Sequence, residues 1–194
     1  FDIDATMLPA SKPVIAVTAV RTGCGKSQTS RRITHILAEL GKKTVVVRHP
    51  MPYGDLARQA VQRFADYEDL DRHDCTIEER EEYEPHLKNG VIVYAGIDYA
   101  AILEQAEREA DVIVWDGGNN DTPFYKPDRW ITVADPHRPG HELLYYPGTD
   151  NFDRADLILA NKVATAPDEG IATVERNARE RNPEAALVRA ASPV

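Results

Sequence analysis

The chain has 194 residues, 42% of them hydrophobic and 28% charged, which is the composition of one ordinary globular domain. Its net charge of -9, with no run rich in lysine and arginine, argues against broad binding to nucleic acids or anionic membranes. The apolar runs are too short to cross a bilayer and no signal-like segment begins the chain, so we expect a cytoplasmic protein that binds neither nucleic acid nor membrane.

Two features concern the chain as a whole. Cys24 and Cys75 lack the spacing of a disulfide framework or a zinc site, and we expect both to be free thiols. The chain begins with Phe1 and closes on the apolar segment "VRAASPV". We therefore expect residues 1–194 to form a single domain that belongs to a longer protein.

The first half of the chain alternates apolar runs with amphipathic segments. A strand-like run follows Pro13, and a helix is expected from Ser27 to Leu40, ended by Gly41. A second strand, "KTVVVR", comes next. The pattern then predicts a helix around Leu56 to Phe64, an acidic helix within "TIEEREEYEPHL" and the strand "GVIVYA".

The second half continues the alternation. Asp98 is expected to cap a helix that leads into the strand "DVIVWD". The strands "WITVAD" and "DLILANK", a helix after Pro167 and a last strand "AALVRA" follow. Strands that alternate with helices predict a three-layer α/β fold, with a mostly parallel central sheet and helices on both faces.

The loop after the first strand has a phosphate-binding signature, "GCGKS", in the strand-loop-helix context that a P-loop NTPase requires. Gly23 and Gly25 would let backbone N–H groups turn toward phosphate oxygens, Lys26 would contact the β- and γ-phosphates, and Ser27 would ligate Mg²⁺. A tight turn with a surface lysine is the alternative, but it would not need these residue types in this order. The predicted nucleotide-binding residues of the loop are Thr22, Gly23, Cys24, Gly25, Lys26, Ser27 and Gln28.

Arg21 occupies the second loop position, where P-loop proteins of the class containing dethiobiotin synthetase and the nitrogenase iron protein often carry an extra lysine. Its guanidinium would neutralise a phosphoryl group in transit, as a catalytic residue acting within one subunit or across a dimer. A homo-oligomer therefore stays open. The alternative is a solvated arginine beside the loop.

Asp116 lies at the end of a buried apolar strand, where the carboxylate of a Walker B element meets Mg²⁺. We predict that Asp116 is catalytic, and that Asp116 and Ser27 are the metal ligands. Gly117 and Gly118 would allow close approach to the γ-phosphate, although Asp-Gly also marks plain turns.

The nucleobase site is predicted at Asn161 and Lys162, which follow a strand as in the N-K-x-D element that reads guanine. The fourth position is Ala164, so the carboxylate partner of guanine is missing. The amide of Asn161 could still pair with adenine. The sequence thus favours ATP, with GTP as the alternative, and Mg²⁺ as cofactors.

A second ligand is indicated by polar loops that follow other strand ends, at the edge where open α/β sheets bind their ligands. Basic side chains recur in these loops in an otherwise acidic protein, which suggests a pocket for a small, multiply charged anion. Isolated surface residues are the alternative. The predicted substrate-binding residues are Arg48, His49, Asp55, His137 and Arg138.

Longer motifs place the chain closer to one family. The segments "RTGCGKS", "VVRHPMPYGDL", "WDGGNNDTPFYKPD" and "VADPHRPGHE" resemble the P-loop domain of the cyclic 2,3-diphosphoglycerate synthetases, over about residues 1–194. The resemblance implies ATP- and Mg²⁺-dependent closure of 2,3-diphosphoglycerate into its cyclic pyrophosphate, with release of ADP and phosphate. Many bacterial members are labelled GTPases, and the family pattern has Asp where this chain has Ala164.

The resemblance implies a reaction in two steps. A substrate phosphate would attack the γ-phosphoryl of ATP in line, and the second substrate phosphate would then close the ring and expel phosphate. Two other classes remain: a nucleotide switch or metallochaperone-like NTPase acting on a partner protein, and a kinase of another small acid.

Overall fold

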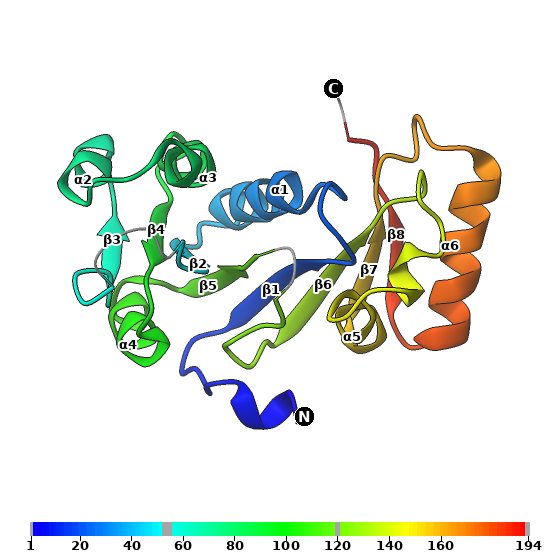
Figure 1. Ribbon diagram of the computed structural model, residues 1–194, viewed down its shortest axis with the longest axis horizontal. Helices are drawn as coiled ribbons and strands as arrows, with labels where there is room; N and C mark the ends of the chain where they lie inside the picture. Colours follow the sequence, from blue (N-terminus) through cyan, green and yellow to red (C-terminus); the bar gives the residue numbers. More distant parts are fainter. Residues whose placement is uncertain (1, 52–55, 119–120, 193–194) are drawn as a thin grey trace. The chain divides into compact units, whose positions relative to one another are not determined.

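The computed structural model describes residues 2–51, 56–118 and 121–192, and these divide into two compact units (Figure 1). Unit 1 comprises Phe1–Val14, Ser30–Asp116 and Phe124–Lys126, and unit 2 comprises Ile15–Thr29, Gly117–Pro123 and Pro127–Val194. No helix among the described residues is long and apolar enough to cross a membrane.

Unit 1 is built on four strands in the order β3-β4-β2-β5. β2 pairs in parallel with β4 and β5, and the short β3 adds to β4 in the antiparallel sense. Helices α1 and α3 lie on one face of these strands and α4 on the other (Figure 1). The elements of this unit are η1 Asp4–Thr6, α1 Lys26–Glu39, β2 Thr44–Arg48, β3 Gln62–Phe64, α2 Tyr67–Arg72, α3 Ile77–Leu87, β4 Ile92–Ala95, α4 Tyr99–Glu109 and β5 Val112–Asp116.

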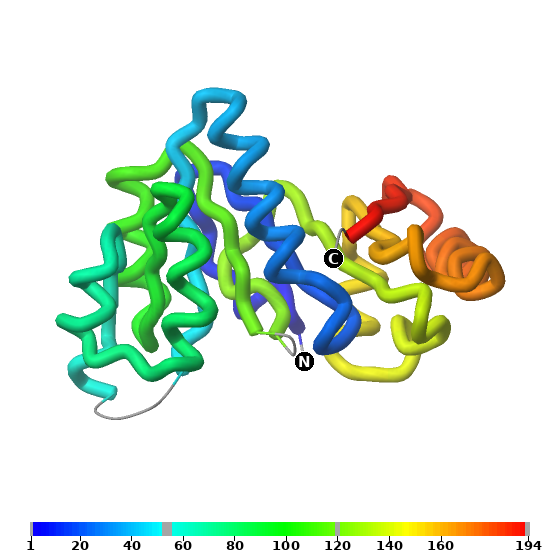
Figure 2. The backbone as a smooth tube through the Cα atoms, turned by 90° about the horizontal axis from the view of Figure 1, so that it is seen from above, coloured from blue at the N-terminus to red at the C-terminus, as the bar shows by residue number. Residues whose placement is uncertain are grey.

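Unit 2 is built on the strands β1-β6-β7-β8, all paired in parallel. α5 packs on β6 and α6 on β7. In Figure 2, α6 and β8 form the orange-to-red end of the chain. The elements of this unit are β1 Val14–Ala19, β6 Arg129–Ala134, η2 His141–Leu143, α5 Gly148–Arg154, β7 Leu157–Ala160, α6 Asp168–Arg181 and β8 Ala186–Arg189.

The predicted alternation of strands and helices is confirmed for most of the chain, because the local signals agree with the final packing. All five residues of β2 are buried, as its continuous apolar run requires. The Asp98 side chain accepts a hydrogen bond from the Ala101 N–H at 2.9 Å and caps α4. Gly41 follows α1 with a φ of 70°, a conformation that favours glycine.

The helix predicted around Leu56 to Phe64 is wrong. Residues 56–59 form a turn, and Gln62–Phe64 form the edge strand β3. Two tertiary contacts decide the conformation: Arg63 forms a double hydrogen bond with Glu109 on α4, and the buried ring of Phe64 packs on Tyr83 with centroids 4.8 Å apart. The short helices α2 and α5 were not predicted. α5 begins at Gly148 after the N-cap residue Pro147, and a Pro-Gly pair is typical of a turn.

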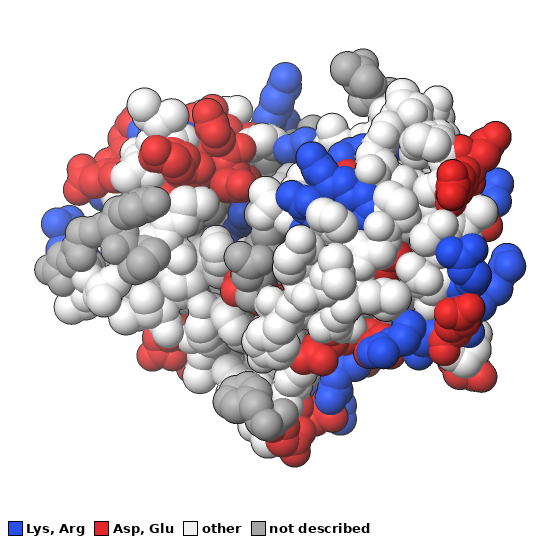
Figure 3. Space-filling model, turned by 45° about the vertical axis from the view of Figure 1, so that its right-hand side comes forward, with Lys and Arg blue, Asp and Glu red and all other residues white. Residues whose placement is uncertain are grey.

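The acidic helix predicted within "TIEEREEYEPHL" is α3. Thr76 and Glu79 form a reciprocal capping box at its N-terminus, which fixes where the helix begins. Glu78 and Glu81 are exposed. Figure 3 shows such a gathering of acidic side chains at its upper left. The acidic residues of α3 thus face solvent except where they cap the helix or pair with arginine.

Candidate functional site

The phosphate-binding loop lies in unit 2, between β1 and the start of α1 at Lys26. Gly23 and Gly25 have φ angles of 86° and 101°, which side chains rarely adopt. A Cβ atom on Gly25 would lie 2.2 Å from Nδ2 of Asn161, so no larger residue fits there without a shift. Lys26 is buried at the first position of α1. The loop therefore has the turn and the helix N-terminus that phosphate binding requires.

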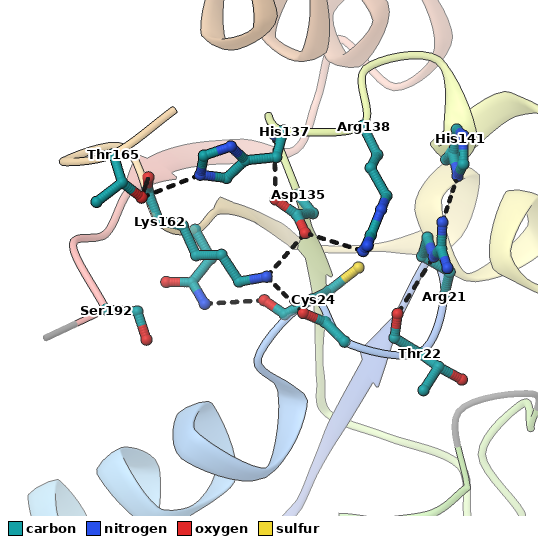
Figure 4. A network of polar contacts seen from close by, with 12 residues as sticks. Arg21, Thr22, Cys24, Asp135, His137, Arg138, His141, Lys162, Thr165 and Ser192 are labelled. Atoms are coloured by element: carbon teal, nitrogen blue, oxygen red, sulfur yellow. Dashed lines mark hydrogen bonds and ion pairs between the residues drawn. The ribbon is translucent and has the colours of Figure 1, made fainter. Parts of the chain in front are cut away.

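Two residues that follow β7 form hydrogen bonds to backbone carbonyl groups of this loop (Figure 4). The Asn161 side chain donates to the carbonyl of Cys24 at 2.8 Å, and Lys162 Nζ donates to the carbonyl of Gly23 at 2.5 Å. In a trans peptide the next N–H points away from the carbonyl. The N–H groups of Cys24 and Gly25 thus face away from Asn161 and Lys162, toward the side where a phosphate would bind.

Asp135, at the end of β6, organises the residues around the loop. Its carboxylate is 2% exposed and lies 2.8 Å from Lys162 Nζ and 3.7 Å from the Arg138 guanidinium. It also accepts a hydrogen bond from the backbone N–H of His137. Asp135 is not among the site residues predicted from the sequence, although an aspartate at a strand end was the available signal.

The predicted substrate residues His137 and Arg138 lie in this network. His137 Nε2 is 3.0 Å from the hydroxyl of Thr165, and Arg138 is half-exposed with its guanidinium beside Gly23. Figure 4 shows the Arg138 side chain reaching Asp135, whereas the ring of His137 points toward Thr165. The structure therefore brings the Arg138 guanidinium to the phosphate loop, while the side chain of His137 contacts Thr165.

The reactivity of Cys24 tests whether the loop shields this side chain from solvent. Its side chain is 1% exposed, and burial raises the pKa of its thiol to about 11. Because the thiolate is the reactive form, we expect iodoacetamide at pH 7.5 to leave Cys24 unmodified in the folded protein. Mass spectrometry of the alkylated chain measures this, with guanidinium-unfolded protein as the control in which Cys24 must react. Rapid labelling of the folded chain would show that the loop opens in solution.

Arg21 is fixed beside the loop by two contacts. Its Nη1 lies 2.9 Å from Nδ1 of His141, and its Nε donates to the carbonyl of Thr22 at 3.2 Å (Figure 4). His141 lies on η2, and its partnership with Arg21 was not predicted. Because the arginine can only donate, Nδ1 of His141 must accept, which places the ring proton on Nε2.

In unit 1, Asp116 at the end of β5 is fully buried beside Arg48 from β2. Nη1 of Arg48 lies 2.7 Å from Oδ2 of Asp116, and Nη2 lies 2.7 Å from Oε2 of Glu82 on α3. Burial opposes the charge on Arg48, but Asp116 and Glu82 outweigh it and raise the pKa of the guanidinium. His86 Nε2 lies 3.6 Å from the same Asp116 oxygen. Neither Glu82 nor His86 was predicted to adjoin Asp116.

The structure places the other predicted site residues as follows. Arg48 is 3% exposed and paired inside unit 1, so its guanidinium does not lie on an open edge as the sequence suggested. His49 is partly buried beside it, and Asp55 lies outside the described residues. In unit 2, Ser27 is partly buried, Thr22 is exposed, and Gln28 is hydrogen-bonded to Ser192. The cationic pocket predicted from residues of both units stays a prediction.

Solved structures that are similar to this chain share its fold. The hydrogenase maturation factor HypB from Archaeoglobus fulgidus matches 92% of the chain and 80% of its own, with a TM-score of 0.54 and 17% identity. LpxK from Aquifex aeolicus, solved in complex with ATP, matches 80% of the chain and 50% of its own, with a TM-score of 0.59 and 17% identity. The chain has the P-loop NTPase fold. At this identity the likeness shows the fold alone.

A curated relative is far more similar in sequence. The arginine synthetase ArcE from Thermococcus kodakarensis is 62% identical over 190 residues, which are 98% of this chain. The chain spans 42% of the length of that relative. No protein-family model matches the chain.

Proposed function

We propose that this chain is the nucleotide-binding unit of an arginine synthetase and that it uses the γ-phosphoryl group of ATP. The observation that carries the proposal is the 62% identity to ArcE across 98% of the chain. The phosphate-binding loop of unit 2 also supports the proposal. Lys26 is buried there, and Asn161 and Lys162 form hydrogen bonds to the loop backbone.

The chemistry follows from what a synthetase must do. Phosphorylation turns a poor leaving oxygen into phosphate, and an incoming nitrogen then displaces phosphate to form a carbon–nitrogen bond. In this scheme the loop N–H groups and Lys26 hold the phosphates and neutralise the charge that develops during transfer.

Ser27 and Asp116 supply a hydroxyl and a carboxylate, the oxygen donors that Mg²⁺ prefers. The described residues contain no group of three or more His, Cys, Asp or Glu side chains that could hold a metal ion. When bound, Mg²⁺ would offset the negative charge of the nucleotide. Nη1 of Arg48, 2.7 Å from Oδ2, is a positive charge beside the buried carboxyl group of Asp116.

ATP is the proposed nucleotide. Ala164 removes the carboxylate that would read guanine, and Asn161 uses one amide hydrogen for Cys24, which leaves its oxygen and second hydrogen for adenine. GTP is the alternative, and competition binding between the two nucleotides compares them.

Cyclisation of 2,3-diphosphoglycerate, implied by the family resemblance, is the second candidate. Both reactions need the same phosphate loop, so the fold does not discriminate between them. The name of the 62% identical relative favours the arginine reaction. The predicted small anionic substrate remains a feature of the cyclase candidate.

The test is a domain exchange. This chain replaces the matching region of the Thermococcus kodakarensis arginine synthetase. The chimera is then incubated with ADP, radiolabelled phosphate and arginine, which are the products of the proposed reaction, so that its reverse is measured. We expect label to enter ATP only when arginine is present, with lysine as the control amino acid and the unaltered relative as the positive control.

A chimera that binds ATP but incorporates no label with arginine would contradict the proposal. A parallel sample with ATP and 2,3-diphosphoglycerate, followed by ³¹P NMR, examines the cyclase. Pyrophosphate-type signals that depend on this substrate would favour cyclisation instead.

A further inference from the structure

A pocket of about 600 Å³ lies in unit 2 directly beside the phosphate loop. It is lined by residues 20–22, which precede the loop, and by residues 145–148, which lead into α5. Its volume is within the range of about 300–1,000 Å³ that is usual for small-molecule sites. Thr22 lines the pocket and is joined to Gly23 of the loop, so an occupant would lie next to the predicted phosphate site.

The lining has one fixed positive charge and an aromatic wall. Among the described residues that line the pocket, only Arg21 has a charged side chain, and Tyr145, Tyr146 and Pro147 supply the apolar surface. His141 and the carbonyl of Thr22 fix two edges of the Arg21 guanidinium. A guanidinium favours a planar carboxylate, and tyrosine faces favour an aliphatic chain or a cation.

The wall is held in place before any ligand arrives. A Cβ atom on Gly148 would lie 2.3 Å from the carbonyl oxygen of Val20, so the two sides of the pocket touch backbone to backbone. The rings of His141 and Tyr145 meet edge to face with centroids 5.3 Å apart. The hydrogen bond to Arg21, the ring contact and the backbone contact therefore fix the pocket's shape, which reduces the entropy cost of binding.

We infer that this pocket binds the amino-acid substrate or product, with its α-carboxylate on Arg21 and its side chain along Tyr145 and Tyr146. The identity of the amino acid, arginine, rests on the proposed function. A guanidinium on that side chain would lie over a tyrosine face and away from Arg21, since like charges repel. In this proposal Arg21 binds the carboxylate of the amino acid. This replaces the role predicted from the sequence, in which Arg21 stabilises the phosphoryl group during transfer.

Two other occupants fit less well. A compact polyanion such as 2,3-diphosphoglycerate would meet one arginine and a mainly aromatic wall, which offers little to its second phosphate. A second copy of the chain would cover the exposed Tyr146, but it would not need the fixed guanidinium. Both occupants are distinguishable outcomes of the experiment below.

The experiment titrates the 194-residue chain, saturated with MgADP, with L-arginine and with agmatine, which is arginine without its carboxylate. Ring signals of ¹³C-labelled tyrosine report binding at Tyr145 and Tyr146. We expect arginine to shift these signals and agmatine to bind about 10- to 100-fold more weakly, because a charge-assisted pair is lost.

Three variants locate the contact. Arg21→Gln should remove the preference for arginine over agmatine. Tyr146→Ala, at a side chain that is 69% exposed, should weaken the binding of both ligands several-fold. Arg179→Gln, an exposed arginine on α6, is the matched control and should change neither.

The inference is overturned if arginine leaves the ring signals unmoved, if agmatine binds as well as arginine, or if Arg21→Gln keeps the preference. Ring shifts that depend on protein concentration, or on 2,3-diphosphoglycerate alone, would assign the pocket to a second copy or to a polyanion. The proposed function fails separately: in that case arginine binds here, but the chimera shows no arginine-dependent labelling of ATP.

Discussion

Replacing Lys26 by alanine is expected to lower phosphoryl transfer by about 100- to 1,000-fold, the usual cost of losing one donor that stabilises transition-state charge. Lys26 is the first residue of α1 and is 4% exposed, so its ammonium is part of the loop and not of the solvent-facing surface. Binding of ATP should weaken about tenfold or more, because the lost interaction is charge-assisted. Calorimetry with ATP measures the binding, and the arginine-dependent exchange in the chimera measures the transfer.

Lys42→Ala is the matched control, since Lys42 is an exposed lysine just beyond the other end of the same helix. It should leave both quantities unchanged. Full activity in the Lys26 variant, with normal folding by circular dichroism, would mean that the loop does not hold the reacting phosphate.

Replacing Arg48 by methionine should reduce the free energy of unfolding by about 3–5 kcal/mol, because it leaves a buried carboxylate without its partner. Asp116 is 0% exposed and Arg48 is 3% exposed, and their 2.7 Å contact lies between β2 and β5. Chemical denaturation followed by circular dichroism measures the change. Removing the carboxylate as well, in an Arg48→Met, Asp116→Leu double variant, should restore part of the stability.

The control is Arg108→Met, which breaks a pair between Arg108 and Glu104 whose side chains are more than two-thirds exposed. Such surface pairs contribute only about 0–1 kcal/mol. Equal losses for Arg48→Met and Arg108→Met would contradict the view that burial makes the Arg48 pair important.

The sequence predicted those parts of the fold in which local signals agree with tertiary packing. The buried run of β2, the cap at Asp98 and the glycine after α1 each carry their own physical reason within a few residues. β3 could not be predicted in this way. It is an edge strand of three residues held by Glu109 and Tyr83, which are distant in sequence.

The candidate site shows the same division. The glycines and Lys26 of the phosphate loop are readable because the motif is contiguous and its turn chemistry is local. The links from Asp135 to Lys162 and from Arg21 to His141 join separate loops, and neither has a spacing rule that reveals it. Arg48 was misleading because an arginine at a strand end looks the same in sequence whether it faces a ligand or a buried aspartate.

The bond from Asn161 to the carbonyl of Cys24 spans 137 residues of the chain, and the bond from Lys162 to Gly23 spans 139. The conformation of the loop thus depends on two segments that are distant in sequence. A short peptide with the sequence of the loop, or the same loop grafted into another protein, would lack the hydrogen bonds from Asn161 and Lys162. It would therefore not keep the conformation of the loop. Transfer of this phosphate-binding loop to another protein therefore requires that the segment after β7, with Asn161 and Lys162, be transferred with it.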